Sequence, residues 1–213
     1  MLARALRSAE HAAARLIRAA GRSRPAEIVF LGDSITQFWS DEDPWLFRPG
    51  RINAGLSGDT TATMRARFDR DVLVRRPRAV HIMGGTNDLW YGDPGAAGAA
   101  TIANIRWMAE AGRSHGIAVI LAPPPPITRA AEPLFTHPEL FEPLRGAVAE
   151  IARAGGHVLV DYAASLADAD GQPRPGMTTD GVHLTRAGYR AIREQAATAI
   201  AAAPTPRGGI RPV

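Results

Sequence analysis

The sequence contains no cysteine and no lysine, and aromatic residues make up only 6% of it. The absence of cysteine excludes disulfides, thiolate nucleophiles and thiolate metal ligands, and it leaves the redox compartment open. No stretch approaches the roughly 20 consecutive apolar residues that a membrane-spanning helix needs. We therefore expect a soluble protein in the cytoplasm.

All 25 basic residues are arginines, and the 21 acidic residues leave a formal net charge of only +4. The sequence pI of 10.5 exaggerates this basicity, because almost nothing titrates between the histidines and the arginines. An arginine-rich stretch at residues 65–78 is interleaved with Asp69 and Asp71, which is typical of a solvated helix face. The charge pattern therefore favours neither nucleic acid nor a membrane surface as a partner.

The chain length of 213 residues and a hydrophobic fraction of 46% predict one globular domain. Residues 1–24 have apolar residues at helical spacing, but arginines interrupt the apolar region that a signal peptide needs. We expect these residues to form a helical extension, residues 25–203 to form the domain, and residues 204–213 to form a loose tail.

Short apolar runs alternate along the chain with segments of helical period. The predicted strands lie at residues 28–31, 51–54, 79–83, 118–122 and 158–162, and the predicted helices at 60–74, 94–112, 138–154 and 185–202. Strands alternating with helices indicate a parallel sheet covered on both faces, joined by right-handed crossovers. The predicted fold class is α/β, as a three-layer α/β/α sandwich. Thr185 is expected to cap the last helix, and Gly112 and Gly155 are expected to end two others in left-handed conformations.

The first predicted strand leads through Gly32 and Asp33 to Ser34. In open α/β sheets, ligands bind in the crevice beyond the carboxyl ends of the strands. Ser34 is therefore a candidate nucleophile. Gly-Asp-Ser is also ordinary turn chemistry, so the tripeptide alone does not separate a nucleophile from a turn.

Asp180 and His183 stand three residues apart, just before the last predicted helix. With Ser34 they supply a hydroxyl nucleophile, an imidazole base and a carboxylate that orients the imidazole. In isolation, this spacing is more often explained by Asp180 as a turn cap and His183 as a satisfied surface residue. Asp161, at the end of the last predicted strand, is an alternative carboxylate without the three-residue spacing.

Acyl transfer also needs hydrogen-bond donors aimed at the developing oxyanion. Two segments at predicted strand ends offer them, the backbone N–H of Gly55 and the side-chain amide of Asn87, with the Ser34 N–H as a third. Gly and Asn also occur in turns for conformational reasons. Trp90 and Tyr91 follow Asn87 and are candidates for a wall of the substrate cleft, with half-buried packing as the equal alternative.

In order and spacing, these four segments resemble the SGNH hydrolases, also called the GDSL esterase and lipase family. The resemblance implies that Ser34, His183 and Asp180 form a triad and that Ser34, Gly55 and Asn87 form the oxyanion hole. Residues 58–61 (Gly-Asp-Thr-Thr) are similar to the branch that includes platelet-activating-factor acetylhydrolase catalytic subunits and bacterial lysophospholipase-like esterases. The family implies a flavodoxin-like fold with five parallel strands and neither a metal nor an organic cofactor.

The function expected from this resemblance is a serine esterase acting on small acyl esters, with acetyl or other short chains. A lysophospholipase, a thioesterase and an acyltransferase on the same triad stay open, as does a non-catalytic binding domain on this scaffold. A flavin-binding protein is disfavoured, because residues 33–36 are not a hydroxyl- and glycine-rich phosphate cradle. The expected partner is a small-molecule ester, and association into homo-oligomers is open.

Three further polar residues are expected to have structural roles. Asp33 and Asp88 adjoin the candidate residues and are predicted to anchor local hydrogen bonds. His81 lies inside an apolar strand and is predicted to be a buried, satisfied histidine. The proline run at residues 123–126 is expected to cross the rim of the sheet, as a plain connector or as a wall of the cleft.

Overall fold

The computed structural model describes residues 26–91 and 97–204. Its sheet has five parallel strands in the order β2-β1-β3-β4-β5, which confirms the predicted fold class. The strands are β1 (Ile28–Gly32), β2 (Arg51–Gly55), β3 (Ala79–Met83), β4 (Ala118–Ala122) and β5 (Val158–Leu159). The predicted extension at residues 1–24 and the predicted tail after residue 204 lie outside the described residues.

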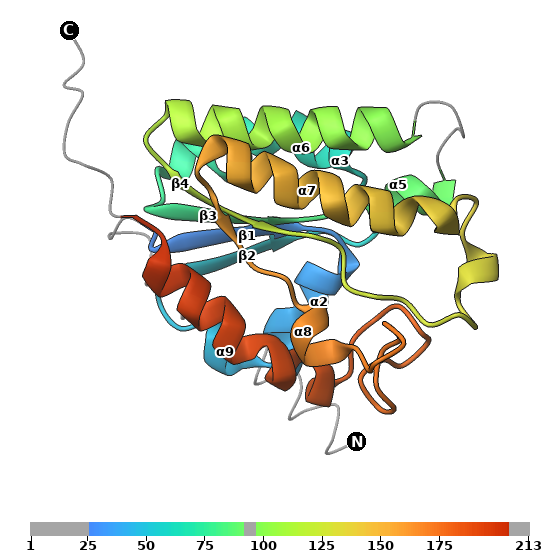
Figure 1. Cartoon of the computed structure of the whole chain (residues 1–213). Coiled ribbons are helices and arrows are strands. Elements are labelled where there is room, and N and C mark those ends of the chain that lie inside the picture. The colour runs from blue at the N-terminus through green and yellow to red at the C-terminus, as the bar shows by residue number, and fades with distance from the viewer. Residues whose placement is uncertain (1–25, 92–96, 205–213) are drawn as a thin grey trace, which may run out of the picture.

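Helices cover both faces of the sheet, so the molecule has three layers (Figure 1). One face carries α3 (Thr61–Ala66), α5 (Thr86–Tyr91), α6 (Ala97–Ser114) and α7 (Phe141–Gly155), and the other carries α2 (Ser34–Glu42), α8 (Ala163–Leu166) and α9 (Arg186–Ala202). The shorter helical segments are α4 (Phe68–Asp71), η2 (Pro44–Leu46), η3 (Leu73–Arg75), η4 (Glu132–Leu134) and η5 (Pro138–Leu140). Among the described helices, none is both long and apolar enough to cross a membrane.

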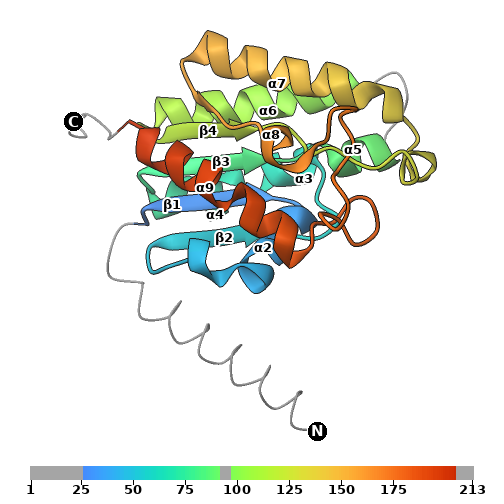
Figure 2. The ribbon, with the colours of Figure 1, turned by 60° about the horizontal axis from the view of Figure 1, so that its bottom comes forward.

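The register of the sheet aligns the ends of its central strands. Gly32 of β1 pairs with Gly55 of β2 and with Met83 of β3, and Met83 pairs in turn with Ala122 of β4. Because all the strands run in one direction, the segments that follow them leave from the same edge of the sheet. The strand arrangement therefore brings together the start of α2, the loop after β2 and the start of α5 (Figure 2).

The core beneath α2 is aromatic. Trp39 is fully buried and stacks on Tyr189 of α9, with 5.7 Å between ring centroids. The Tyr189 hydroxyl donates a hydrogen bond to the backbone oxygen of Ile35 at 2.7 Å. Farther along α2, its C-cap Asp43 accepts from Arg193 Nε at 2.7 Å. These contacts fix the helix that begins at Ser34 against the helix that follows His183.

Several elements differ from the sequence prediction. The helix predicted at residues 60–74 is divided into α3, α4 and η3, because Arg67 has a non-helical backbone with φ of −104° and ψ of 3°. The last strand has two residues instead of five. Thr185 caps α9 as predicted, accepting from the Gly188 N–H at 3.1 Å.

The predicted left-handed positions at Gly112 and Gly155 are wrong. Both residues lie inside helices, and the left-handed conformations occur at Gly116 (φ 72°) and Gly156 (φ 64°). Gly112 is instead required by close packing, since a Cβ there would lie 3.0 Å from a Val119 methyl carbon.

We expect Gly55→Ala to destabilise the fold. A Cβ at Gly55 would lie 2.2 Å from the backbone nitrogen of Gln37, an atom that cannot rotate away. The expected loss in the free energy of unfolding is about 1–3 kcal/mol, the usual cost of overpacking. Urea denaturation measures it. Gly146→Ala on α7, where a Cβ would meet nothing within 4 Å, is the matched control. It should gain about 0.5–1 kcal/mol, and equal losses in both variants would contradict the argument.

Asp33 gives the fold a specific pH dependence. Burial raises the pKa of this carboxyl from 3.8 to about 7, against the opposing effects of its hydrogen bond from the Ile35 N–H and of nearby His183. The folded state therefore binds more protons than the unfolded state between these two values, so the Asp33 contribution to stability is present at low pH and falls as pH rises through this window. Asp33→Asn, which keeps a side-chain acceptor for Ile35, should remove that part of the decline. An unchanged slope in denaturation experiments from pH 4 to 7 would contradict it.

Candidate active site

Ser34 is the first residue of α2, directly beyond β1. The Asp33 side chain caps this helix by accepting from the Ile35 N–H at 3.0 Å, which fixes the turn between strand and helix. The Ser34 N–H belongs to the first helical turn, whose amides have no acceptor within the helix. Ser34 therefore presents both a hydroxyl and a backbone donor at the edge of the sheet. The expectation that Asp33 anchors local hydrogen bonds is confirmed.

His183 and Asp180 meet Ser34 from the loop that precedes α9. Ser34 Oγ lies 2.9 Å from His183 Nε2, and His183 Nδ1 lies 2.6 Å from Asp180 Oδ2. With Nδ1–H donating to the carboxylate, Nε2 is left as the acceptor for the Ser34 hydroxyl. The structure thus joins the three residues in one hydrogen-bonded chain.

Asp180 is held as an anion in this chain. Its burial acts to raise the pKa, but hydrogen bonds from the His183 side chain and from the backbone amides of His183 and Val182 outweigh it and lower the pKa. Both amides donate to Asp180 Oδ1, at 2.8 Å and 3.0 Å. The alternative carboxylate, Asp161, accepts instead from Arg145 at 2.8 Å. Asp180 is therefore the carboxylate that orients His183.

The loop carrying Asp180 and His183 packs on the segment after β4. The Thr128 N–H donates to the Gly181 oxygen at 2.9 Å, and Gly181 has a left-handed φ of 89°. A Cβ at Gly181 would lie 2.2 Å from Thr128 Oγ1. The segment that follows the proline run therefore supports the loop of the triad residues.

Asn87 lies at the start of α5 and is 9% exposed. Its Nδ2 donates to the backbone oxygen of Asp59 at 2.9 Å, which leaves the second N–H of the amide for another acceptor. Neighbouring Asp88 accepts from the Thr61 N–H at 2.9 Å and from Thr101 Oγ1 at 3.0 Å, so its predicted role as a local anchor is confirmed.

Gly55 does not offer a free donor. Its N–H donates to Asn53 Oδ1 at 2.8 Å, within the same strand. Gly58, three residues later, has a left-handed φ of 81° and is exposed, and in the described part of the chain its N–H has no acceptor. Asn87 reaches Asp59, the residue after Gly58. The expectation for Gly55 is therefore corrected, and the amide available beside Asn87 is that of Gly58.

For Trp90, the structure shows the half-buried packing that was one of the two alternatives left open. Trp90 packs on Phe135, with 4.8 Å between ring centroids, and so lies under the segment after β4. Tyr91 ends α5, and its side chain is outside the described part of the structure. Phe38, which sequence reasoning missed, lies 5.4 Å from the His183 ring and is 37% exposed. Its position four residues after Ser34 puts both on one face of α2.

His81 is buried as predicted but only partly satisfied. Its Nε2 pairs with the Tyr162 hydroxyl at 2.9 Å, whereas Nδ1 has no hydrogen-bond partner within residues 26–91 and 97–204. Burial lowers the pKa of His81 to about 3, so the ring is neutral. Among the described residues, no group of three His, Asp or Glu side chains is placed to hold a metal ion.

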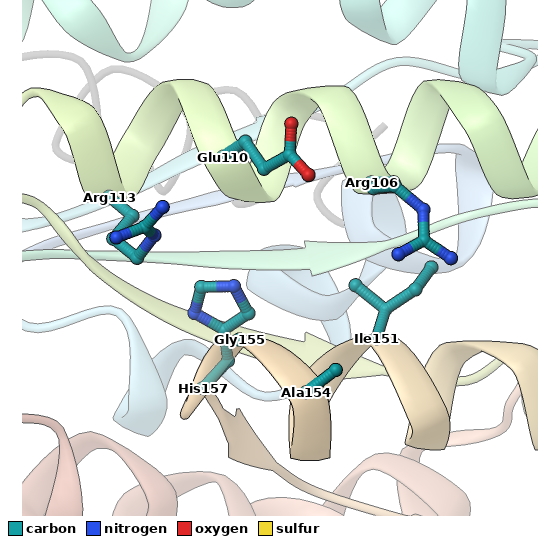
Figure 3. Close-up of a pocket in the computed structure, with 7 residues that line it drawn as sticks. All are labelled: Arg106, Glu110, Arg113, Ile151, Ala154, Gly155 and His157. Carbon is teal, nitrogen blue, oxygen red and sulfur yellow. The ribbon is translucent and has the colours of Figure 1, made fainter.

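A separate cavity of about 320 Å³ lies between α6 and α7 (Figure 3). Arg106, Arg113 and His157 line it together with Glu110, and none of the candidate catalytic residues does. Arg113 and His157 stand at the ends of α6 and α7, where basic side chains stabilise the negative C-terminal ends of helices. Arg113 is thus explained by the end of α6, whereas Arg106 lies in the interior of that helix.

Comparison with known proteins places this geometry in a family. Residues 30–191 match the model of the GDSL-like Lipase/Acylhydrolase family. The crystal structure of a GDSL-like lipase from Bacteroides thetaiotaomicron is 29% identical, with a TM-score of 0.73 over 82% of this chain and 87% of that one.

Two curated relatives match over shorter segments. The uncharacterized lipoprotein YqeF of Bacillus subtilis is 41% identical over 73 residues, which are 33% of this chain and 30% of the relative. An acetylxylan esterase of Geobacillus stearothermophilus is 44% identical over 39 residues, 18% of each chain. This chain therefore spans less than a third of each of these relatives in the matched segments. The family match over residues 30–191 shows that the chain belongs to the GDSL-like lipase/acylhydrolase family.

Proposed function

We propose that the protein is a serine esterase that hydrolyses short-chain acyl esters, acetyl esters above all, through Ser34, His183 and Asp180. The observation that carries the proposal is the hydrogen-bonded chain from Asp180 through His183 to Ser34 Oγ. A binding domain has no need for a serine hydroxyl aligned on an imidazole that a carboxylate orients. The similarity of a short segment to an acetylxylan esterase supports the acetyl group.

In the first half of the reaction, Ser34 Oγ attacks the ester carbonyl carbon while His183 Nε2 takes the hydroxyl proton. Asp180 holds the imidazole with Nδ1 protonated and stabilises the positive charge that forms on it. The tetrahedral intermediate collapses when His183 returns the proton to the leaving alcohol. In the second half, His183 activates a water molecule, which attacks the acyl group on Ser34 and releases the acid.

The oxyanion of each tetrahedral intermediate needs several donors. We assign them to the Ser34 N–H, the Gly58 N–H and the second Nδ2–H of Asn87. The free Gly58 amide beside Asn87 supports this assignment over one that uses Gly55, whose amide is bonded to Asn53. These donors are fixed in place before substrate binds, so they cost no reorganisation when charge develops.

Phe38 supplies an exposed apolar surface beside His183. Its ring lies beside the His183 ring and is partly exposed. An apolar group of the substrate that packs on Phe38 would be held next to the base. Trp90 is not assigned a place in the cleft, because its ring packs on Phe135.

The nucleophile is tested with a series of p-nitrophenyl esters from acetate to long acyl chains. We expect the wild type to hydrolyse the acetate best and Ser34→Ala to lose on the order of a thousandfold or more in kcat. Ser114→Ala, on the exposed end of α6, is the matched control and should retain activity. A preference for long chains would favour a lysophospholipase, and full activity in Ser34→Ala would contradict the proposed nucleophile.

Asn87→Ala tests the oxyanion hole. Loss of one such donor costs about 100- to 1000-fold in kcat with little change in KM, because the interaction forms only with the charged intermediate. Steady-state kinetics with p-nitrophenyl acetate measures both constants. Asn104→Ala on α6, where the side-chain amide donates to Thr61 Oγ1 at 3.3 Å, is the control. If Asn87→Ala raised KM and left kcat unchanged, Asn87 would be a binding residue for the ground state.

A further inference from the structure

Arg67 is a buried arginine that the chemistry proposed above does not use. The sequence pattern places it on a solvated helix face, but its side chain is only 8% exposed. It stands between α3 and α4, where the helix is interrupted. Burial of a guanidinium requires charged or hydrogen-bonding partners around it, and those partners indicate what it does.

The guanidinium binds three groups from three different segments. Its Nε lies 2.6 Å from Asp59 Oδ2, its Nη1 donates to Asp71 Oδ2 at 2.8 Å, and its Nη2 donates to the backbone oxygen of Gly32 at 3.1 Å. Asp71 belongs to α4, Asp59 to the loop after β2, and Gly32 to the end of β1. A planar guanidinium can serve three directions at once, which a lysine ammonium on a flexible stem does less well.

The Gly32 carbonyl connects the strand that precedes Ser34 to the loop after β2 through hydrogen bonds. It lies two residues before Ser34 and accepts from both Arg67 Nη2 and the Leu56 N–H, the latter at 3.0 Å. Both donors therefore hold the loop after β2 against the strand that carries the nucleophile. A Cβ on Gly32 itself would lie 2.6 Å from the Met83 oxygen, so this carbonyl end of β1 is tightly enclosed.

Asp59 is held from two sides. Its carboxylate is bound by Arg67, and its backbone oxygen accepts from Asn87 Nδ2 at 2.9 Å. Asp59 directly follows Gly58, so contacts that hold the Asp59 side chain and its backbone oxygen also limit the position of Gly58. Both loop-side oxyanion donors, the Gly58 N–H and Asn87, are therefore tied to one residue that Arg67 fixes.

We propose that Arg67 is a positioning residue, which sets the distance between Ser34 and the oxyanion donors by binding Gly32 and Asp59 together. The predicted effect of Arg67 on catalysis rests on the proposed function. Its predicted effect on the loop after β2 rests only on the observed contacts. Arg67 touches no reacting atom, and it acts only through the two groups that it joins.

The test compares Arg67→Lys with Arg70→Lys, the same substitution three residues away at an exposed side chain whose hydrogen bonds go to Asp71. Arg67→Lys should lower kcat for p-nitrophenyl acetate on the order of 10- to 100-fold, less than deletion of a donor, with little change in KM. Arg70→Lys should keep the wild-type kcat. Asp59→Asn, which keeps the side-chain shape, is the second variant if Arg67→Lys does not fold.

Hydrogen exchange of individual amides by NMR gives a readout independent of activity. The Leu56 and Asp59 amides, which donate within this loop to Gly32 and Leu56, should exchange faster in Arg67→Lys and unchanged in Arg70→Lys. Equal exchange in both variants would overturn the proposal whatever the kinetics. Faster exchange with wild-type kcat would overturn its catalytic part. A wild type without Ser34-dependent hydrolysis would overturn the proposed function, and the exchange data would still decide whether Arg67 holds the loop.

Discussion

The hydrogen bond between Ser34 Oγ and His183 Nε2 joins two residues that are 149 positions apart in the chain. Its 2.9 Å length depends on the end of β1, which sets Ser34, and on the loop before α9, which sets His183. Neither segment can shift alone without breaking it. The rest of the fold can be understood as the set of contacts that keeps these two segments in register.

Contacts between α2 and α9 help to hold these two segments in place. The Tyr189 hydroxyl binds the Ile35 backbone, and Trp39 stacks on the Tyr189 ring. Because Ile35 follows Ser34 and Tyr189 lies in the second turn of α9, these contacts couple the two helices close to the triad. On the other side of Ser34, the aligned ends of β1, β2 and β3 place the donor loop and Asn87 at the same edge. The candidate site is thus assembled from four separate segments, namely the junction of β1 and α2, the loop after β2, the start of α5 and the loop before α9.

Local patterns in the sequence were enough to predict the sheet, most of the long helices and the three residues that the structure joins in one hydrogen-bonded chain. Apolar runs define buried strands, and Asp180 and His183 lie within one loop, so their contact is nearly local. Gly55 was expected to supply a free donor, but its amide donates to Asn53, whereas Gly58 lies in a left-handed loop conformation. Both features depend on folded contacts that the spacing of the glycines does not show.

The position of Arg67 was misjudged, and the sequence left two alternatives open for Trp90, because both depend on residues far away in the chain. The charge pattern predicts a solvated face for the arginines near Asp69. It contains no information about the Gly32 carbonyl at the end of β1, to which the buried Arg67 side chain donates. Aromatic residues near a motif are equally consistent with a cleft wall and with core packing. For Trp90, the contact with Phe135 in the folded structure indicates packing. Phe38 could have been found from its spacing to Ser34, once the helix after Ser34 is expected.

The most direct test of the account is to trap the acyl-enzyme. The protein is mixed with p-nitrophenyl acetate, quenched in acid within milliseconds, digested and analysed by mass spectrometry. The account predicts one acetyl group on the peptide that contains Ser34, absent after hydrolysis is complete and absent in His183→Ala. Turnover of the ester with no acyl adduct, or with the adduct on another residue, would contradict the central claim that Ser34 is the nucleophile.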